Sequence, residues 1–183
     1  STAQKKNSPI HISDFEKMDI KTGGLTFNKR YNRCTIPFLT KPYVQLQGIA
    51  EPIRVFDGTP HSTYSISFLV NGVGDLETHA IGDFETYADK MKDLAIHALE
   101  KNTSRVESIF PGSESTQMEI KELLRNKLDD LKKISFYVNP KMTRFMTYDR
   151  DSKRQQPVDF KDMKNFPLGL YSIIMKVDHV DIT

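Results

Sequence analysis

The spacing of apolar residues changes twice along this chain of 183 residues, and this change limits the folds that it can adopt. Before residue 71, short stretches repeat with a period of two, which is the period of a half-buried strand. Residues 83–101 repeat instead at i, i+3, i+4 and i+7, the pattern of an amphipathic helix. Beyond residue 133 the period of two returns. The predicted order is therefore strands, helices and strands.

The first part of the chain predicts strands at residues 25–36, 43–49, 53–56 and 64–70, after an irregular stretch at 9–24. The segment YSISFLV is the clearest strand, because Tyr64, Ile66 and Phe68 share one face. Gly48 lies inside the second strand, where a glycine indicates a bulge.

The middle and last parts of the chain predict two helices and three more strands. Asp83 is placed to cap the helix at 83–101. Thr116 and Glu119 have the spacing of a capping box for a second helix at 117–132. The later strands are expected at residues 134–138, 142–148 and 170–182, with a charged loop at 149–157.

This order favours a mainly β or α+β fold, because the helices interrupt the strands and do not alternate with them. An OB-type Greek-key barrel carries its helix between the third and fourth strands. We therefore expect an OB-like barrel with a pair of helices inserted between the early and late strands. Residues 1–20 are expected to be a flexible segment, and residues 21–183 a single domain whose helical insert spans about 83–132.

The bulk composition excludes several classes of protein. Cys34 is the only cysteine, so an intrachain disulfide and a cysteine-based zinc site are excluded, and an intracellular location is expected. No apolar run approaches the roughly 20 residues that a membrane-spanning helix needs. No membrane partner and no cofactor are expected.

Charge is distributed unevenly, although the net charge is only +2. Residues 20–50 hold five cations and no acid. Residues 75–130 hold thirteen acids against seven cations, a net of −6, and residues 132–164 hold nine cations against four acids, a net of +5. Two basic, strand-like regions thus flank an acidic, helical middle, which favours a polyanionic partner at the flanks.

Aromatic and basic residues are interleaved in two segments, residues 27–43 and 141–154. Single-stranded nucleic acid is bound by rings that stack on bases and by cations that follow phosphates. On strand geometry, Phe27, Lys29, Tyr31 and Arg33 are expected to share the binding face. A barrel core of Phe and Tyr with cations on the wet face would explain part of this pattern. The candidate nucleic-acid-binding residues are Phe27, Lys29, Arg30, Tyr31, Arg33, Lys41, Tyr43, Arg54, Lys141, Arg144, Phe145, Tyr148, Arg150, Lys153 and Arg154.

Catalytic and metal-binding motifs are weaker. Glu119 and Lys121 match the E-x-K pair of metal-dependent nucleases, but acids in the first turn of a helix also favour its dipole. Asp178, His179 and Asp181 could form a ligand cluster, although a strand places them on mixed faces. We expect no enzyme. A small nuclease is one alternative, and a structural virion domain that docks proteins through acidic helices is another.

Four segments resemble the OB-fold single-stranded DNA-binding proteins of large eukaryotic DNA viruses, those of algal viruses first and those of poxviruses and asfarviruses more distantly. They are YNRCTIPFLTKPYVQLQGI, YSISFLV with the helix that follows it, ISFYVNPKMTRFMTYDRDSKRQQPVDF and LGLYSIIMKVDHVDI. The chain lacks the tryptophan that such proteins often carry in their last strands. The resemblance implies non-catalytic coating of single strands, without sequence preference, in viral DNA replication, recombination or repair at its site in the host cell.

The expected partner is therefore single-stranded DNA, with self-association along the strand as a further expectation. RNA stays open as a partner, because nothing in the sequence identifies a reader of the 2′-hydroxyl.

Overall fold

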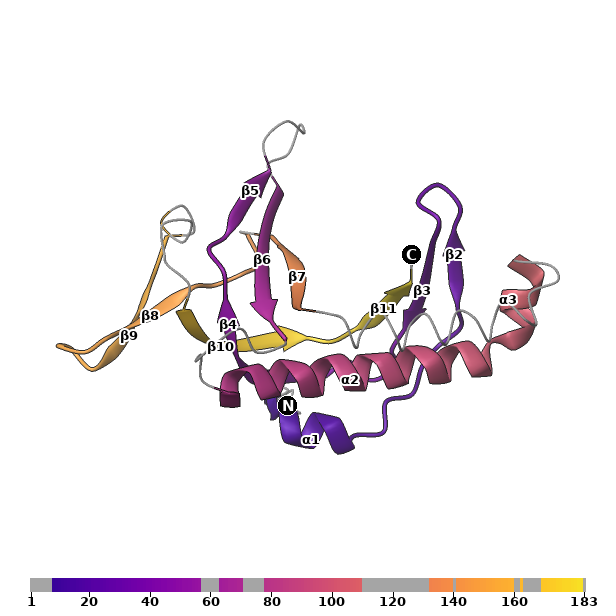
Figure 1. The fold of residues 1–183 in the computed structure, drawn as a ribbon, viewed down its shortest axis with the longest axis horizontal. Helices are drawn as coiled ribbons and strands as arrows, with labels where there is room; N and C mark the ends of the chain where they lie inside the picture. The colour runs from indigo at the N-terminus through magenta and orange to yellow at the C-terminus, as the bar shows by residue number, and fades with distance from the viewer. Residues whose placement is uncertain are drawn as a thin grey trace, which may run out of the picture.

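The computed structural model describes residues 8–56, 63–70, 78–109, 132–139, 141–159, 162 and 169–182 (Figure 1). Strands hold more of these residues than helices do, so the expected mainly β, α+β class is confirmed. The helices are α1 (Ile12–Lys17), α2 (Thr78–Lys101) and α3 (Thr103–Ile109). The strands are β1 (Ile10–His11), β2 (Thr26–Asn28), β3 (Arg33–Pro37), β4 (Tyr43–Ala50), β5 (Arg54–Phe56), β6 (Thr63–Leu69), β7 (Lys133–Val138), β8 (Met146–Asp149), β9 (Arg154–Pro157), β10 (Gly169–Lys176) and β11 (His179–Ile182).

Strand β4 organises the largest sheet. It pairs antiparallel with β10 along its whole length, from Tyr43↔Lys176 to Ala50↔Gly169. At its other edge β1 pairs parallel with it at Val44, and β6 joins at Ala50, with β5 and β7 on either side of β6. Val44 and Leu46 are buried while Tyr43, Gln45 and Gln47 are exposed, so the alternation in the sequence predicted this strand correctly.

A second sheet, in the order β11-β3-β2, is built from the continuations of the same two strands. The pairing of β3 with β11 ends at Pro37↔His179, and the pairing of β4 with β10 begins at Tyr43↔Lys176. Between these two pairs, one strand has the five residues 38–42 and the other has only residues 177–178. The extra residues bend the pair, as in a bulge, and send it into the second sheet. The prediction of one strand over 170–182 is therefore wrong. Across the bend, Phe38 N–H donates to Asp178 O over 2.9 Å.

The first predicted strand, at 25–36, is also wrong, because it is a hairpin. Strands β2 and β3 pair antiparallel, and residues 29–32 turn between them. Asn28 Oδ1 accepts a hydrogen bond of 3.1 Å from Arg30 N–H, which is an Asx turn. Asn32 has a φ of 48°, a conformation that asparagine adopts more readily than most residues.

Helix α2 lies across one side of the sheets (Figure 1). It begins five residues before the predicted cap, so Asp83 lies inside it. The Asp83 carboxylate accepts a hydrogen bond of 2.8 Å from Gln47 N–H, at an edge of β4 between β1 and β6. It thus occupies a position that a strand would otherwise fill. Phe84, on the buried face of α2, stacks on Phe68 with ring centroids 4.6 Å apart.

Gly48 does not mark a bulge, as the sequence suggested, but a close approach. It lies in the regular ladder opposite Tyr171. A Cβ at this position would overlap the ring of Phe84 and lie 3.0 Å from Phe68 Cδ1. The helix packs this near to β4 because the strand has no side chain there.

The N-terminal segment packs on the domain from residue 10 onward, where an irregular, flexible stretch was expected. Ile12 and Phe15 of α1 are buried in the core. Lys90 of α2 donates hydrogen bonds of 3.1 Å to Glu16 O and 2.5 Å to Met18 O, at the carbonyl end of α1. Residues 10–20 thus pack against the part of the chain in which the domain was predicted to begin at residue 21.

The end of α2 is tied to the start of the β2–β3 hairpin. Asn102 Nδ2 donates to Ala98 O over 2.8 Å, and its Oδ1 accepts from Leu25 N–H over 3.3 Å. Helix α3 follows directly and was not predicted. Of the helix predicted at 117–132, residues 117–131 lie outside the described residues.

The late strands differ from their predicted bounds. Strand β7 agrees within one residue, whereas the strand predicted at 142–148 is β8, displaced toward the C-terminus. The predicted loop at 149–157 contains β9, which pairs with β8 as a hairpin.

Within the described ranges, the three sheets are open and no closed barrel is formed. No helix among these residues is long and apolar enough to span a bilayer.

Candidate nucleic-acid interface

The β2–β3 hairpin carries three cations and one ring in its turn and at the start of β3. These residues are here called the basic hairpin (Lys29, Arg30, Tyr31 and Arg33). All four residues are exposed. The guanidinium carbons of Arg30 and Arg33 lie 5.4 and 5.9 Å from the centroid of the Tyr31 ring, within cation–π range. Neither Lys29 nor Arg30 forms an ion pair with another described residue. Lys29 and Arg30 therefore project positive charge that no carboxylate among the described residues balances.

The expected binding face through this stretch is wrong. Phe27 pairs with Cys34, which is buried, and Phe27 itself packs half-buried against the core. Arg33 pairs with Asn28 and so points to the opposite face. Lys29 and Tyr31 belong to the turn. Base stacking on Phe27 has no support in this geometry, while all the predicted cations of this stretch remain accessible.

The guanidinium of Arg33 lies beside a network of polar side chains on the outer face of β3 and β11. Its Nη1 lies 3.9 Å from Asp181 Oδ2, and Thr35 Oγ1 donates to Asp181 Oδ1 over 2.6 Å. His179 Nε2 lies 3.3 Å from the same carboxylate, and its Nδ1 lies 2.5 Å from Asp178 Oδ1. No group suited to hold a metal ion occurs among the described residues. The segment of residues 178–181 thus places the Asp181 carboxylate and the His179 ring beside Arg33.

A second basic surface lies on the outer face of β5, β6 and β7. Arg54, a predicted site residue, pairs with Ser65, which pairs in turn with Tyr137 of β7. Residues directly opposite in antiparallel strands point to the same face, so these three share one row. Lys133, on the same face of β7, lies 3.4 Å from Glu51 Oε2, and Arg54 lies 3.9 Å from it. Two cations against one acid leave this face positive.

Tyr137 was not among the predicted site residues, yet it is 82% exposed. The signal for it was present in KISFYV, where Ile134, Phe136 and Val138 alternate with Lys133, Ser135 and Tyr137. The segment from residue 141 onward is richer in charge, and its signal is stronger than that of a single ring on the strand before it.

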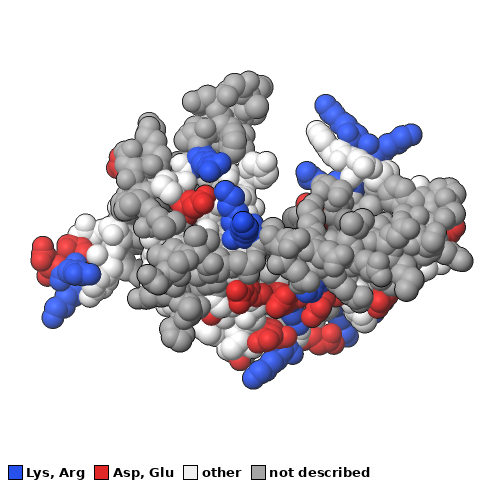
Figure 2. Space-filling view, in the orientation of Figure 1, with Lys and Arg blue, Asp and Glu red and all other residues white. Residues whose placement is uncertain are grey.

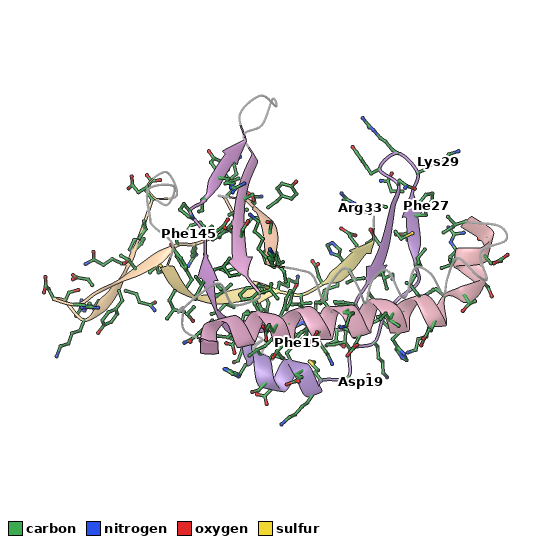
Figure 3. All side chains as sticks on the ribbon, in the orientation of Figure 1. Phe15, Asp19, Phe27, Lys29, Arg33 and Phe145 are labelled. Carbon is green, nitrogen blue, oxygen red and sulfur yellow. The ribbon has the colours of Figure 1, made fainter. Side chains whose placement is uncertain are left out.

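The two basic surfaces project from the same side of the molecule. In Figure 1 the β5–β6–β7 strands and the β2–β3 hairpin rise opposite the side covered by α2. Figure 2 shows the surface hollowed between them, with Lys and Arg side chains on both flanks, while acidic side chains gather below, over α1 and α2. Glu85, Asp89 and Asp93 are exposed there at a spacing of four along α2. Figure 3 shows Lys29 and Arg33 on the hairpin and Asp19 on the opposite side of α2.

No protein-family model, no curated protein and no solved structure matches this chain. The chemistry of the hollow must therefore be read from its residues. Its flanks offer guanidinium and ammonium donors for phosphate oxygens, and the exposed rings of Tyr31 and Tyr137 for stacking. Glu119 and Lys121, the nuclease pair of the sequence, lie outside the described residues.

The second predicted segment lies apart from this hollow. Phe145 and Lys29 lie on opposite sides of the β5–β6–β7 strands (Figure 3), and the β8–β9 hairpin forms the far end of the view (Figure 1). Tyr148, Arg150, Lys153 and Arg154 are exposed on that hairpin. The structure therefore does not bring the two predicted segments together into one site.

The β8–β9 hairpin is also less basic than the β2–β3 hairpin. Residues 146–157 hold three cations and two acids, whereas residues 26–35 hold three cations and no acid. The Ser152 hydroxyl and the Asp151 N–H donate hydrogen bonds that lower the pKa of Asp149, so this acid keeps its charge.

The remaining candidates lie on two connecting segments and at the start of β4. Lys141 and Arg144 are exposed before β8. Arg144, with Phe145 and Pro157, lines a separate open pocket of about 540 Å³. Phe145 itself packs against the core. Lys41 is exposed ahead of β4, where Tyr43 lies on the uncovered face.

Proposed function

We propose that this protein binds single-stranded DNA without sequence specificity and without catalysis, as an intracellular accessory of DNA replication, recombination or repair. The observation that carries the proposal is the hollow between Arg54 and Lys133 on one flank and the basic hairpin on the other. Unbalanced cations on two facing walls fit a polyanion that passes between them.

Counterion release sets how such binding depends on salt. If the five cations of the hollow each neutralise one phosphate, the logarithm of the binding constant should fall with the logarithm of salt concentration with a slope of about −3.5, since each phosphate of a single strand contributes about −0.7. Hydrogen-bonding side chains that read bases would add a contribution that does not depend on salt. A protein without sequence preference should show little of it.

The experiment is a titration of fluorescein-labelled oligo-dT, followed by anisotropy at several salt concentrations. The variant Lys29→Glu with Arg30→Glu should weaken binding by roughly tenfold or more and flatten the salt slope. The matched control, Lys17→Glu with Lys101→Glu, changes the net charge equally but lies on α1 and α2. Equal loss in both variants, or no binding by the wild type at low salt, would contradict the proposal.

We infer for the finer architecture an OB-like barrel of the viral single-strand-binding type. Strands β3–β4 and β10–β11 each bend from one sheet into the other, as strands shared between the two sides of a barrel do. Closure would need hydrogen bonds between edge strands of the two sheets. An experimental structure of the complete domain in which both sheets stay open would rule out this barrel.

A protein-docking role is the second candidate, and the row of Glu85, Asp89 and Asp93 on α2 favours it. Like charges four residues apart destabilise a helix slightly, so a basic partner would relieve them. Reversal of all three to lysine would leave oligo-dT affinity unchanged or raised if docking is a separate activity, and would abolish capture of a partner protein.

A further inference from the structure

Tyr137 differs from the other exposed rings of this protein in how few neighbours it has. It is 82% exposed, against 58% for Tyr31 and 59% for Tyr148. Two guanidinium groups lie over the Tyr31 ring, whereas Tyr137 makes no ring or cation–π contact with another described residue. Both faces of the Tyr137 ring are therefore open to a ligand, while a base that approached Tyr31 would first have to displace an arginine.

The surroundings of Tyr137 on its own face of the sheet are small and polar. Ser65 lies directly across the ladder, and Ser135 and Asn139 lie two positions away along the chain. Ser67 and Ser135 share a hydroxyl hydrogen bond of 2.7 Å, so they are satisfied without a ligand. The neighbours in these positions have short side chains, but Ser65 and Ser67 are themselves buried, so access for a flat aromatic group rests on the exposure of the Tyr137 ring.

Cations flank this ring along two directions of the sheet. Arg54 lies in the same row, two strands away, which is about 10 Å at the usual strand separation. Lys133 lies four residues back along β7, about 13 Å at the usual rise. Both contact the single carboxylate of Glu51 and exceed it in charge. A nucleotide whose base met Tyr137 would therefore find both positive charges together, beside Glu51, for a neighbouring phosphate.

We propose that Tyr137 is a stacking site for one unpaired nucleobase, and that this site makes the hollow select single strands over duplex. The inference deepens the proposed function and rests on it. The cations of the hollow attract any polyanion, but a ring can stack only on a base whose face is exposed. In a duplex, each base face is already covered by the next base pair.

The first test compares three variants by anisotropy with labelled oligo-dT. Tyr137→Ala should weaken binding roughly 5- to 150-fold, the range found when a stacking aromatic is truncated. Tyr137→Phe keeps the ring and should stay within about twofold of the wild type. Tyr148→Ala removes another exposed tyrosine, on the β8–β9 hairpin apart from the hollow, and should leave the affinity unchanged. An unchanged affinity of Tyr137→Ala, or an equal loss in Tyr148→Ala, would overturn the inference.

The second test removes the base and keeps the phosphates. An oligomer of abasic deoxyribose units should bind the wild type more weakly than oligo-dT by the same factor as Tyr137→Ala, and Tyr137→Ala should bind both oligomers equally. A variant that still prefers oligo-dT would contradict stacking at Tyr137. That result would leave the proposed function standing, because the wild type would still bind oligo-dT. Failure of the wild type to bind either oligomer would reject both.

Discussion

At Gly48 the backbone of β4 lies against the ring of Phe84, and a single hydrogen atom decides how closely α2 can pack. Gly48→Ala should lower the free energy of unfolding by about 1–3 kcal/mol, because the new methyl group must displace a ring that stacks on Phe68. Urea unfolding followed by circular dichroism measures this change. Gly24→Ala is the control, since no atom lies within 4 Å of its Cβ position. A loss as large at Gly24 would show that the overlap is not the cause.

The ionisation of Tyr87, which is buried between α2 and the core, is linked to folding. Burial raises its pKa to about 12, against about 10 in an unfolded chain. The folded state keeps the proton longer, so this contribution to stability is complete below pH 10 and is lost as the pH rises toward 12. Raising the pH from 9 to 11 should therefore destabilise the wild type by about 1.4 kcal/mol more than Tyr87→Phe. Urea midpoints at both values measure this difference, and equal losses would contradict the assignment.

At the scale of elements, α1 is held to α2 chiefly by buried rings and by one lysine. Lys90 donates to Glu16 O and Met18 O and lies 5.8 Å from the centroid of the Phe15 ring. Lys90→Met keeps the apolar stem and removes the donors, so we expect a loss of about 1–2 kcal/mol. Faster amide exchange in α1 should accompany it.

Lys92→Met is the control for Lys90, because its ion pair of 3.5 Å is made with the exposed Asp89. Pairs of that kind contribute about 0–1 kcal/mol. If both variants lost the same stability, or if amide exchange in α1 did not change, the two carbonyl hydrogen bonds would not be what anchors this helix.

The β2–β3 hairpin shows why the elements could be predicted only in part. The alternation of residues 25–36 reads as one strand, and the turn inside it contains neither glycine nor proline. Asn28 and Asn32 make the turn through an Asx hydrogen bond and a positive φ, which is a weak signal in a sequence. The prediction therefore placed Arg33 and Phe27 on one binding face, whereas in the structure Arg33 lies on the opposite face and Phe27 packs against the core. Its cations were predicted correctly as exposed, because charge and burial seldom coincide.

At the scale of the whole molecule, charge is segregated across the fold. The first part of the acidic middle of the sequence forms α2, and strands from the basic regions before and after it lie on the other side (Figure 2). The β5–β6–β7 strands, which carry Arg54 and Lys133, and the β2–β3 hairpin flank the same hollow although they lie far apart in the chain (Figures 1 and 2). The second basic segment, by contrast, extends away as the β8–β9 hairpin.

The sequence by itself determined the strand-rich class, most of α2 and the surplus of positive charge in two regions, because periodicity and charge are properties of neighbouring residues. Only the tertiary structure decided the bend that splits the last predicted strand, the carboxylate of Asp83 on β4 and the link from Thr35 to Asp181, which are 146 residues apart. It also exposed Tyr137 beside a basic face. These features depend on which strands meet and in what register, and a local pattern of residues does not fix either.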